Sequence, residues 1–579
     1  MKKKILMVYP EIPTTYWSFK HAMPFAGKKA LMPPLGLITV AAMLPAHYEI
    51  RLVDMNISPL DEGDVLWSDM VFVSAMIVQK DSFARVVETC NRLGRPVAAG
   101  GPYPTASHDE IPGVDHFILN EGEVTLPKFI ADYEAGRPAR IYSDETKPDI
   151  TETPVPRFDL LEIDAYGSMA LQSSRGCPYN CEFCDIIEMF GRTPRYKNPG
   201  QMIEEMEALN SAGYTGPLFI VDDNFIGNRK KVKEILARIV VWQEENGRPF
   251  SLYTEASINL AQDEELMDMM VEAGFNMVFI GIETPNTETL EMTNKQHNVR
   301  TDIMENVEKI QRKGIEVLAG FILGFDNEPE NIFDLQLDFI RKSGIPVAMI
   351  GLMLALPNTQ LHRRLQREGR LRGMTHGNNT HEFELNFIPT MPVEKLVAGY
   401  KRVISEIYRP SRYFHRCFTL IKRLPKKKLA GRPVTKGDFK ALFMSLVKQS
   451  FTRYGHRYLA FIIKTLLFNP WHMAAAFNLS IKGYHFFKIT GDIIRANEFK
   501  EYIDRSYRLL EAGIEPFAGR VAAEGKPAVA GTSGRILANI AATYGRLDRE
   551  VQALVAGKMD EFYARCGSTK SGALQEAIE

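Results

Sequence analysis

The chain is organised around one short stretch, Ser174-Arg175-Gly176-Cys177-Pro178-Tyr179-Asn180-Cys181-Glu182-Phe183-Cys184. Its three cysteines, Cys177, Cys181 and Cys184, follow C-x3-C-x2-C spacing and are half of the six cysteines in the chain. A loop of this length can turn three thiolates toward one point, as an iron–sulfur cluster requires. Three ligands leave one iron of a [4Fe–4S] cube without a protein ligand, and an open metal position can bind a substrate. We therefore interpret the loop as a redox-cluster site.

Other interpretations of the three cysteines fit the sequence less well. A structural zinc site needs a fourth Cys or His close by, and none lies between Cys184 and His297. A disulfide would leave one of the three over, and the remaining cysteines are scattered as in proteins of a reducing cytoplasm. Chance is a further reading, but this spacing is more specific than a lone C-x2-C pair.

The spacing, with the aromatic Phe183 directly before the last cysteine, resembles that of the radical S-adenosylmethionine (SAM) superfamily. The resemblance implies that the amino and carboxylate groups of SAM bind the open iron. It also implies that an electron from the cluster, supplied by a reductant such as flavodoxin or ferredoxin, cleaves SAM to a 5'-deoxyadenosyl radical. That radical removes hydrogen from an unactivated carbon.

The composition indicates a globular protein of several domains. A chain of 579 residues is long enough for about two to four domains. Apolar residues make up 45% and charged residues 24%, and the net charge of -1 selects no class of partner. We find no apolar stretch of the roughly 18 residues that a membrane-spanning helix needs. The apolar run after Lys4 is short and ends at Pro10, so we expect no signal peptide and a cytoplasmic protein.

Residues 1–135 alternate between strand and helix patterns, which favours a Rossmann-like parallel sheet with helices on both faces. Apolar runs predict strands at Ile5–Tyr9, Glu49–Asp54, Met70–Ala75, Pro96–Ala99 and His116–Leu119. Helical periodicity predicts helices at Gly36–Leu44, Ser82–Leu93 and Val124–Tyr133. Ligands of such sheets bind beyond the carboxyl ends of the strands, where the sequence places Ser74, Gly100, Gly101, Glu121 and Gly122.

Those strand-end residues have two readings. Glycines let a ligand approach the backbone closely, but ordinary turns also use them. The runs Pro33–Leu37, Gly100-Gly101 and Glu121–Thr125 resemble the cobalamin-binding domain that precedes many radical SAM domains. The resemblance implies that the strand-end residues named above contact cobalamin. The D-x-H-x-x-G motif that supplies a lower histidine ligand in other cobalamin proteins is absent, so we expect no such ligand here.

An aromatic loop, Thr14–Phe19, follows the first predicted strand. It can cover a flat apolar substrate or the corrin ring, or it can pack between domains, and we slightly favour packing.

Residues 136–165 contain Pro138, Pro148, Pro154 and Pro156. Repeated proline disfavours helix and central strand, so we expect a linker along the surface.

Residues 166–390 repeat a strand–helix unit six times, which predicts a (β/α)6 partial TIM barrel with its site at the strand C-termini. The predicted strands are Met169–Ser173, Leu218–Val221, Ser251–Ala256, Met277–Ile282, Glu316–Leu323 and Ala348–Leu354. The predicted helices are Pro199–Ala212, Arg229–Asn246, Asp263–Ala273, Thr301–Lys313 and Ile332–Ser343. The cysteine loop follows the first of these strands, which places it at the barrel mouth.

Several polar groups are expected at the same mouth because they end barrel strands. These are Asp222, Asp223, Glu255 and Glu283, with glycines at 320 and 324. Carboxylates can bind an ammonium group or ribose hydroxyls, although a single acid there can also be a helix N-cap. By resemblance, Asp222 and Asp223 bind the SAM amino group, and Glu283 binds the ribose. The resemblance also implies that the Phe183 backbone contacts adenine, and that Gly320 and Gly324 admit adenine or methionine.

Residues 391–579 are predicted to be helical, for example at Val393–Tyr408, Ala441–Tyr454 and Tyr502–Ala512. Residues 401–500 hold 21 Lys or Arg against 4 Asp or Glu, a net charge of +17, densest near Lys426-Lys427-Lys428. A basic, amphipathic helical region can lie on a membrane surface, attract a carboxylate-bearing substrate, or simply be solvated. Nucleic acid is disfavoured by the apolar content and the lack of a nucleic-acid-binding signature. We expect Gly531–Gly534 to be a turn and the last dozen residues to be disordered.

The helical tail resembles that of cobalamin-dependent radical SAM methylases such as hopanoid C-2 methylases and the bacteriochlorophyllide methyltransferases. The resemblance implies a C-methyltransferase in which one SAM methylates cobalamin and a second SAM yields the radical. We expect a large apolar substrate, first a bacteriochlorophyllide side chain and second a hopanoid. The alternatives are a cobalamin-using radical SAM cyclase or oxidoreductase without methyl transfer, and a non-enzymatic Fe–S sensor or lipid-binding scaffold.

Overall fold

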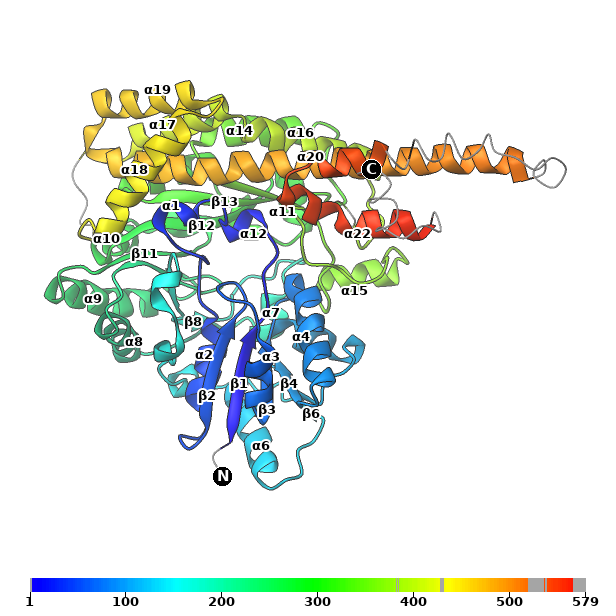
Figure 1. Cartoon of the computed structure of the whole chain (residues 1–579). Helices are drawn as coiled ribbons and strands as arrows, with labels where there is room; N and C mark the ends of the chain where they lie inside the picture. The colour runs from blue at the N-terminus through cyan, green and yellow to red at the C-terminus, as the bar shows by residue number, and fades with distance from the viewer. Residues whose placement is uncertain are drawn as a thin grey trace. The chain divides into compact units, whose positions relative to one another are not determined.

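The computed structural model describes residues 3–381, 383, 385–426, 432–518, 536 and 539–565. The chain divides into two compact units, Met1–His485 and Phe486–Glu579. Figure 1 shows the elements of the whole chain, coloured by residue number. The first unit holds both parallel sheets and the helices that follow them. The domain limits predicted after residues 135, 165 and 390 stay predictions. The predicted turn at Gly531–Gly534, the tail from residue 566 and Lys427-Lys428 lie outside the described residues.

The first sheet has the order β2-β1-β3-β4-β5-β6, and all of its pairs are parallel. Its strands are β1 (Lys4–Tyr9), β2 (Glu49–Asp54), β3 (Met70–Ser74), β4 (Val97–Gly100), β5 (His116–Ile118) and β6 (Ile141–Tyr142). The five predicted strands are confirmed to within one residue. Strand β1 pairs with β2 on one side and β3 on the other, so the strand order reverses there. Such a reversal opens a crevice at the carboxyl ends of the strands.

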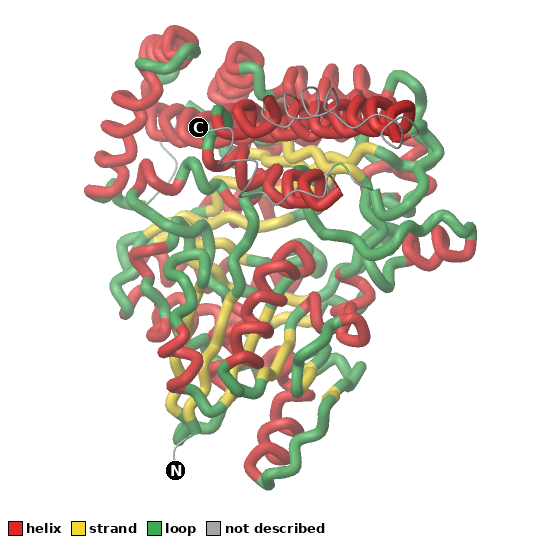
Figure 2. The backbone as a smooth tube through the Cα atoms, turned by 45° about the vertical axis from the view of Figure 1, so that its right-hand side comes forward, coloured by secondary structure: helices red, strands yellow, loops and turns green. Residues whose placement is uncertain are grey.

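Helices cover both faces of this sheet, as Figure 2 shows. Successive residues of a strand point to opposite faces, so Ile5 and Met7 of β1 pack in one core while Leu6 and Val8 pack in the other. The first core includes α2 (Leu35–Met43) and α6 (Gly122–Glu134). The second core includes α3 (Glu62–Trp67), α4 (Lys80–Arg92) and α5 (Pro102–Ser107).

The segment 136–165, predicted to be a surface linker, contributes to the fold. Its strand β6 pairs in parallel with β5 at the edge of the sheet, a position that is compatible with the expectation that repeated proline disfavours a central strand. The two strand residues lie between Pro138 and Pro148, so neither proline interrupts the pairing. Tyr142, Ile150 and Phe158 of this segment are buried.

The second sheet has the order β14-β13-β12-β11-β10-β7 with all pairs parallel, as expected of an open barrel of six strands. The strands are β7 (Met169–Leu171), β10 (Gly216–Ile220), β11 (Phe250–Glu255), β12 (Phe275–Glu283), β13 (Glu316–Leu323) and β14 (Ala348–Leu352). The connecting helices include α8 (Pro199–Ser211), α9 (Arg229–Glu245), α10 (Glu264–Ala273), α13 (Ile303–Lys313) and α14 (Ile332–Ser343). The predicted partial barrel is confirmed.

Helices dominate the rest of the described chain. They are α15 (Gln360–Arg367), α16 (Val393–Ile407), α17 (Pro410–Arg423), α18 (Lys436–Ser450), α19 (Gly455–Phe468), α20 (Met473–Ala518) and α22 (Arg549–Arg565). In the second unit, Phe499 and Ile503 of α20 share a core with Val551, Val555 and Phe562 of α22. Across the described residues, no helix is long and apolar enough to cross a membrane.

Candidate active site at the barrel mouth

The cysteine loop begins where β7 ends. The short strands β8 (Ser174–Arg175) and β9 (Arg195–Tyr196) form an antiparallel ribbon at its base. Gly176 has φ +96, and a Cβ there would lie 2.9 Å from the carbonyl oxygen of Gly191. Only glycine fits that backbone without strain. The Cys177 N–H donates to the same Gly191 oxygen at 3.3 Å, so Gly176 allows the loop to close directly before its first cysteine.

Asp222, just past the end of β10, clamps the start of the loop. The carboxylate is buried and accepts hydrogen bonds from the backbone N–H groups of Ser173 (2.7 Å) and Ser174 (3.0 Å). It also accepts from both hydroxyls, that of Ser174 at 2.7 Å. A carboxylate has about four acceptor positions, and all four are used within the protein. The predicted contact of Asp222 with the SAM amino group stays a prediction, but the geometry makes this residue a support of the loop.

The next two residues extend the support. Asp223 accepts a hydrogen bond from the Gly176 N–H at 2.8 Å. The Asn224 side-chain amide lies 4.0 Å from the Cys177 Sγ, while its oxygen accepts from the Ser257 N–H at 3.2 Å. The loop is thus fixed from the ends of β10 and β11 together.

The three cysteines fit a cluster better than a single ion. All three are free thiols, and Cys181 is buried. Their Sγ atoms do not all lie within 4.8 Å of one another, whereas one tetrahedral zinc ion would hold them that close. A cube of four irons holds its thiolates further apart. Burial raises the pKa of the Cys177 and Cys181 thiols, and a bound metal reverses that effect because it stabilises the thiolate.

A buried ion pair that the sequence analysis missed lies beside the loop. The Lys295 ammonium is 2.7 Å from a carboxylate oxygen of Glu283, and both side chains are buried. The ammonium also lies 5.8 Å from the centre of the Phe183 ring. Glu283 ends β12 with φ +65, next to a shift in strand register. The predicted ribose contact of Glu283 stays a prediction. Lys295 does not directly follow a predicted strand. The rule that polar residues at strand ends mark the site therefore did not point to it.

Arg175 ties the cysteine loop to the first sheet. It donates to Glu121 at 2.9 Å and to Glu123 at 2.8 Å, and Arg195 donates to both oxygens of Glu121. All four side chains are largely buried. Glu121 was predicted to contact cobalamin, and that role stays a prediction, although two arginines already occupy its carboxylate.

The other predicted cobalamin residues gather at the carboxyl edge of the first sheet. Ser74 ends β3, Gly100 ends β4, and Gly122 begins α6. Gly101 has φ +89, and a Cβ there would lie 2.4 Å from the Ser74 hydroxyl oxygen. The absence of a side chain at Gly101 therefore makes room for the Ser74 hydroxyl at the carboxyl edge of the sheet, the edge at which ligands of such sheets bind. The predicted contacts of these residues with cobalamin stay predictions.

The aromatic loop mainly packs. Tyr16 is buried and stacks on Tyr408 of the region after α16, with ring centres 5.6 Å apart. Trp17 remains 44% exposed, with its ring 5.0 Å from that of Phe279 on β12. A Cβ at Gly320 would lie 3.0 Å from the Phe279 ring. The burial of Tyr16 therefore agrees with the favoured expectation that the aromatic loop packs within the protein. The missing side chain at Gly320 makes room for the ring of Phe279.

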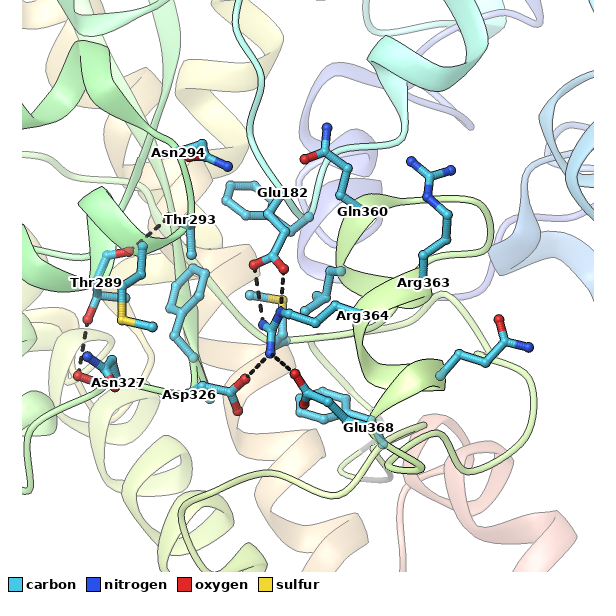
Figure 3. A pocket seen from close by; sticks show the side chains of 18 of the residues that line it. Glu182, Thr289, Thr293, Asn294, Asp326, Asn327, Gln360, Arg363, Arg364 and Glu368 are labelled. Atoms are coloured by element: carbon cyan, nitrogen blue, oxygen red, sulfur yellow. Dashed lines mark hydrogen bonds and ion pairs between the residues drawn. The ribbon is translucent and has the colours of Figure 1, made fainter.

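A cavity of about 950 Å³ opens beside Glu182 and Phe183 of the cysteine loop, and Figure 3 shows its walls. Phe183, Gly324 and Phe325 line it, together with Met292, Met353, Leu361 and Phe387. The polar wall is built on Arg364, which donates to Glu182 at 2.5 Å and to Asp326 at 2.7 Å. Burial alone would raise the pKa of Asp326, but hydrogen bonds from Arg370 and Arg364 hold it below its ordinary value. The cavity therefore combines an apolar lining with paired charges.

Two further carboxyl groups at the mouth have pKa values raised toward neutral pH. Burial, then the charges of Asp223 and Glu283, raises the pKa of Glu255 to about 8. Burial, opposed by the Gly176 N–H, raises the pKa of Asp223 to about 7, and the charge of Asp222 adds to the rise. A cationic ligand would favour their ionised forms, so this edge of the mouth suits an ammonium group.

We expect Glu255→Gln to stabilise the metal-free protein increasingly as the pH rises from 4.5 to about 8. The folded protein keeps the proton that an unfolded Glu loses above pH 4.5, so wild-type stability falls through this window, whereas Gln has no proton to lose. At about 1.4 kcal/mol per pKa unit, the rise from 4.5 to about 8 corresponds to a difference of about 5 kcal/mol at the upper end. Thermal midpoints measured across the window test this, with exposed Glu291→Gln as the control. A constant difference between variant and wild type would contradict it.

Comparison with known proteins agrees with this geometry. The B12 binding domain model matches residues 28–130, and the radical SAM superfamily model matches residues 171–340. A domain of unknown function (DUF4070) matches residues 359–499. The fold and the site thus define a protein with a cobalamin-binding domain followed by a radical SAM barrel.

Relatives extend the comparison to most of the chain. An uncharacterized methyltransferase of Synechocystis sp. is 42% identical over 90% of this chain and 98% of its own length. The hopanoid C-2 methylase of Rhodopseudomonas palustris is 38% identical over 70% of this chain and 77% of its own. The bacteriochlorophyllide d C-12(1)-methyltransferase of Chlorobaculum tepidum is 24% identical over 71% and 88%. The chain belongs to the cobalamin-dependent radical SAM methyltransferase family, whose cofactors are a [4Fe–4S] cluster, SAM and cobalamin.

A solved structure shares the fold. The radical SAM methyltransferase TsrM of Kitasatospora setae, determined with cobalamin and a [4Fe–4S] cluster bound, has a TM-score of 0.58 with this chain. The match covers 83% of this chain and 99% of that one at 15% identity.

Proposed function

We propose that this enzyme methylates an unactivated carbon of a large polycyclic substrate, with a hopanoid-class lipid as the first candidate. The observation that supports this choice is the higher identity with the hopanoid methylase than with the bacteriochlorophyllide methyltransferase. The tetrapyrrole that the sequence led us to expect becomes the second candidate.

The charges around the cavity also favour a neutral substrate. Arg364 is paired with Glu182 and Asp326, and Arg363 with Glu188 at 2.7 Å. Recruiting Arg364 to a substrate carboxylate would leave Glu182 and Asp326 without their partner, which is unfavourable because these acids are largely buried. The exposed Arg363 and Arg367 at the cavity carry no such penalty and are the groups that a carboxylate of the second candidate would meet. A polycyclic hydrocarbon needs only the apolar wall around Phe183 and Phe325.

Different residues of the site have different proposed roles. When bound, the three cofactors supply a carbon-centred radical and a methyl group that can be transferred. Asp222 and Gly176 hold the cysteine loop in shape, and Asp223 and Glu255 present carboxylates to the SAM ammonium group. The aromatic wall around Phe183 and Phe325 gives this side of the cavity an apolar lining, which would limit the access of stray hydrogen donors to a radical.

The proposal is tested by incubating the anaerobically reconstituted protein with a reductant, methyl-labelled SAM and either a hopanoid or a bacteriochlorophyllide. We expect label in the hopanoid, detected as a mass increase of one labelled methyl in place of hydrogen, and 5'-deoxyadenosine as co-product. Label in the tetrapyrrole alone would replace the first candidate by the second.

Two other results would overturn methyl transfer itself. Cleavage of SAM with an altered but unlabelled product would indicate a cyclase or oxidoreductase. Intact SAM in a reduced, cluster-loaded sample would indicate a sensor or scaffold. Cys181→Ala, assayed in parallel, separates cluster-dependent label from background.

A further inference from the structure

Helix α18 exposes a stripe of large apolar side chains, while its other apolar residues Leu442, Met444 and Leu446 are half-buried. The side chains that it buries are polar: Ser445 and Gln449 bond to each other at 2.8 Å, and Ser445 contacts the Tyr458 hydroxyl of α19 at 3.1 Å. Its exposed side chains are Phe439, Phe443 and Val447, spaced four residues apart on one stripe, and Phe451 directly after the helix is 90% exposed. An ordinary surface helix has the reverse arrangement.

Helix α19 carries a second apolar stripe. Leu459, Ile463, Leu466 and Leu467 are exposed at helical spacing, followed by Phe468 and Trp471, which is 66% exposed. The opposite side of α19 packs against the rest of the protein, where the ring of Phe461 lies on that of Phe414 of α17 with ring centres 5.2 Å apart. The exposed stripe is therefore additional to the side that holds the helix in the fold.

We call these residues the α18–α19 face. It comprises Val434, Phe439, Phe443, Val447, Phe451, Leu459, Ile463, Leu466, Leu467, Phe468 and Trp471. Single exposed apolar side chains are common, but a contiguous series of large ones marks an interaction surface. The exposed large side chains elsewhere in the first unit, such as Val241 on α9 and Leu335 on α14, stand apart in sequence.

The charges next to the face identify the occupant. Lys436, Arg453, Arg457 and Lys464 are exposed on the same two helices and the turn between them. Asp438 is the only acidic residue in the sequence from 432 to 480, and Arg432 already pairs with it at 2.6 Å. A second copy of this chain would bring two positive surfaces together, which is unfavourable. An anionic bilayer offers both an apolar interior and negative headgroups.

The helix lengths agree with a position in the plane of the bilayer. Helices α18 and α19 have 15 and 14 residues, whereas a span needs about 20. Short helices with an aromatic and aliphatic side and basic neighbours lie at the boundary between headgroups and acyl chains. Basic side chains near an anionic leaflet each add about 1 kcal/mol of attraction.

We infer that the α18–α19 face is a docking surface for an anionic lipid bilayer. Its apolar stripes enter the boundary between headgroups and acyl chains, and the basic side chains contact lipid phosphates. The inference stands apart from the proposed function, because it rests on the exposed face and not on the substrate. A membrane-resident substrate would nonetheless be reached from such a position.

Vesicle flotation of the full-length holoprotein tests the inference. The vesicles contain phosphatidylcholine alone or phosphatidylcholine with phosphatidylglycerol. We expect the wild type to float with the anionic vesicles. The variant Phe439→Ser/Phe443→Ser/Phe451→Ser should bind at least about tenfold more weakly, since each exposed ring removed takes several apolar carbons out of the bilayer. The variant Val241→Ser/Leu335→Ser, which changes exposed residues outside the face, should bind as the wild type does.

A charge variant separates the two parts of the interaction. Lys436→Glu/Arg457→Glu/Lys464→Glu should abolish the preference for anionic vesicles, as high salt should in the wild type. The inference is overturned if the wild type fails to float with either vesicle, or if the phenylalanine variant floats equally well. It is also overturned if sedimentation shows a dimer that the phenylalanine substitutions dissociate while vesicle binding is absent, because the face would then join two copies.

Discussion

Replacing Cys181 with alanine is expected to abolish both cluster binding and SAM cleavage. The site has three cysteines within one loop, and a cube that needs three protein ligands cannot be held by two thiolates in the orientation that leaves one iron open. The measurements are iron and sulfide content after anaerobic reconstitution, and 5'-deoxyadenosine released on reduction. Both should fall to background, because without the cluster no electron reaches SAM.

The matched controls are Cys90→Ala and Cys417→Ala, which remove buried free thiols outside the loop. Each leaves a small cavity and should lower stability modestly while iron content and SAM cleavage stay near wild type. If Cys181→Ala kept its iron and its SAM cleavage, the ligand assignment would be wrong. If the wild type held zinc in place of iron after anaerobic preparation, the cluster itself would be wrong.

The sequence predicted the structure best where neighbouring residues alone determine the local backbone. The bounds of β13 and α14 were predicted to the residue, at Glu316–Leu323 and Ile332–Ser343. Gly314 before β13 and Gly344 after α14 both adopt positive φ as helix C-caps, and such glycines are readable without a structure. The cysteine spacing is likewise local. In contrast, α5 and β6 are too short to show a period, so they were missed.

Residue roles that depend on distant partners could not be read from the sequence. Glu121 was assigned to cobalamin because it follows a strand, yet its carboxylate meets Arg175, 54 positions away. The pattern of α18 showed that the helix is amphipathic, but which side faces the protein depends on Ser445 and Gln449 finding polar partners. Such pairings follow from tertiary packing, which overrides any single local signal.

Asp222 provides the sharpest test of that distinction, because the resemblance and the geometry assign it different roles. As a SAM ligand it would affect SAM affinity alone. As the clamp of the loop it affects the cluster, since its oxygens accept from Ser173 and Ser174 directly before the cysteines. Asp222→Ala leaves two buried N–H groups without acceptors, at about 1–3 kcal/mol each. Asp222→Asn, which retains one acceptor oxygen and the shape, is the variant to use if the alanine variant does not fold.

We expect Asp222→Asn to weaken iron retention by about 10–100-fold, the usual effect of removing a residue that orients metal ligands. SAM binding per retained cluster should stay unchanged. The matched control is the neighbouring Asp223→Asn, whose amide oxygen can still accept the hydrogen bond from Gly176 but whose lost charge should weaken SAM binding with the cluster retained. Iron content under chelator challenge and SAM affinity by calorimetry measure the two effects separately. If Asp222→Asn kept its iron and lost SAM affinity, the carboxylate would be a ligand of SAM, and the four hydrogen bonds that it accepts would have to rearrange when SAM binds.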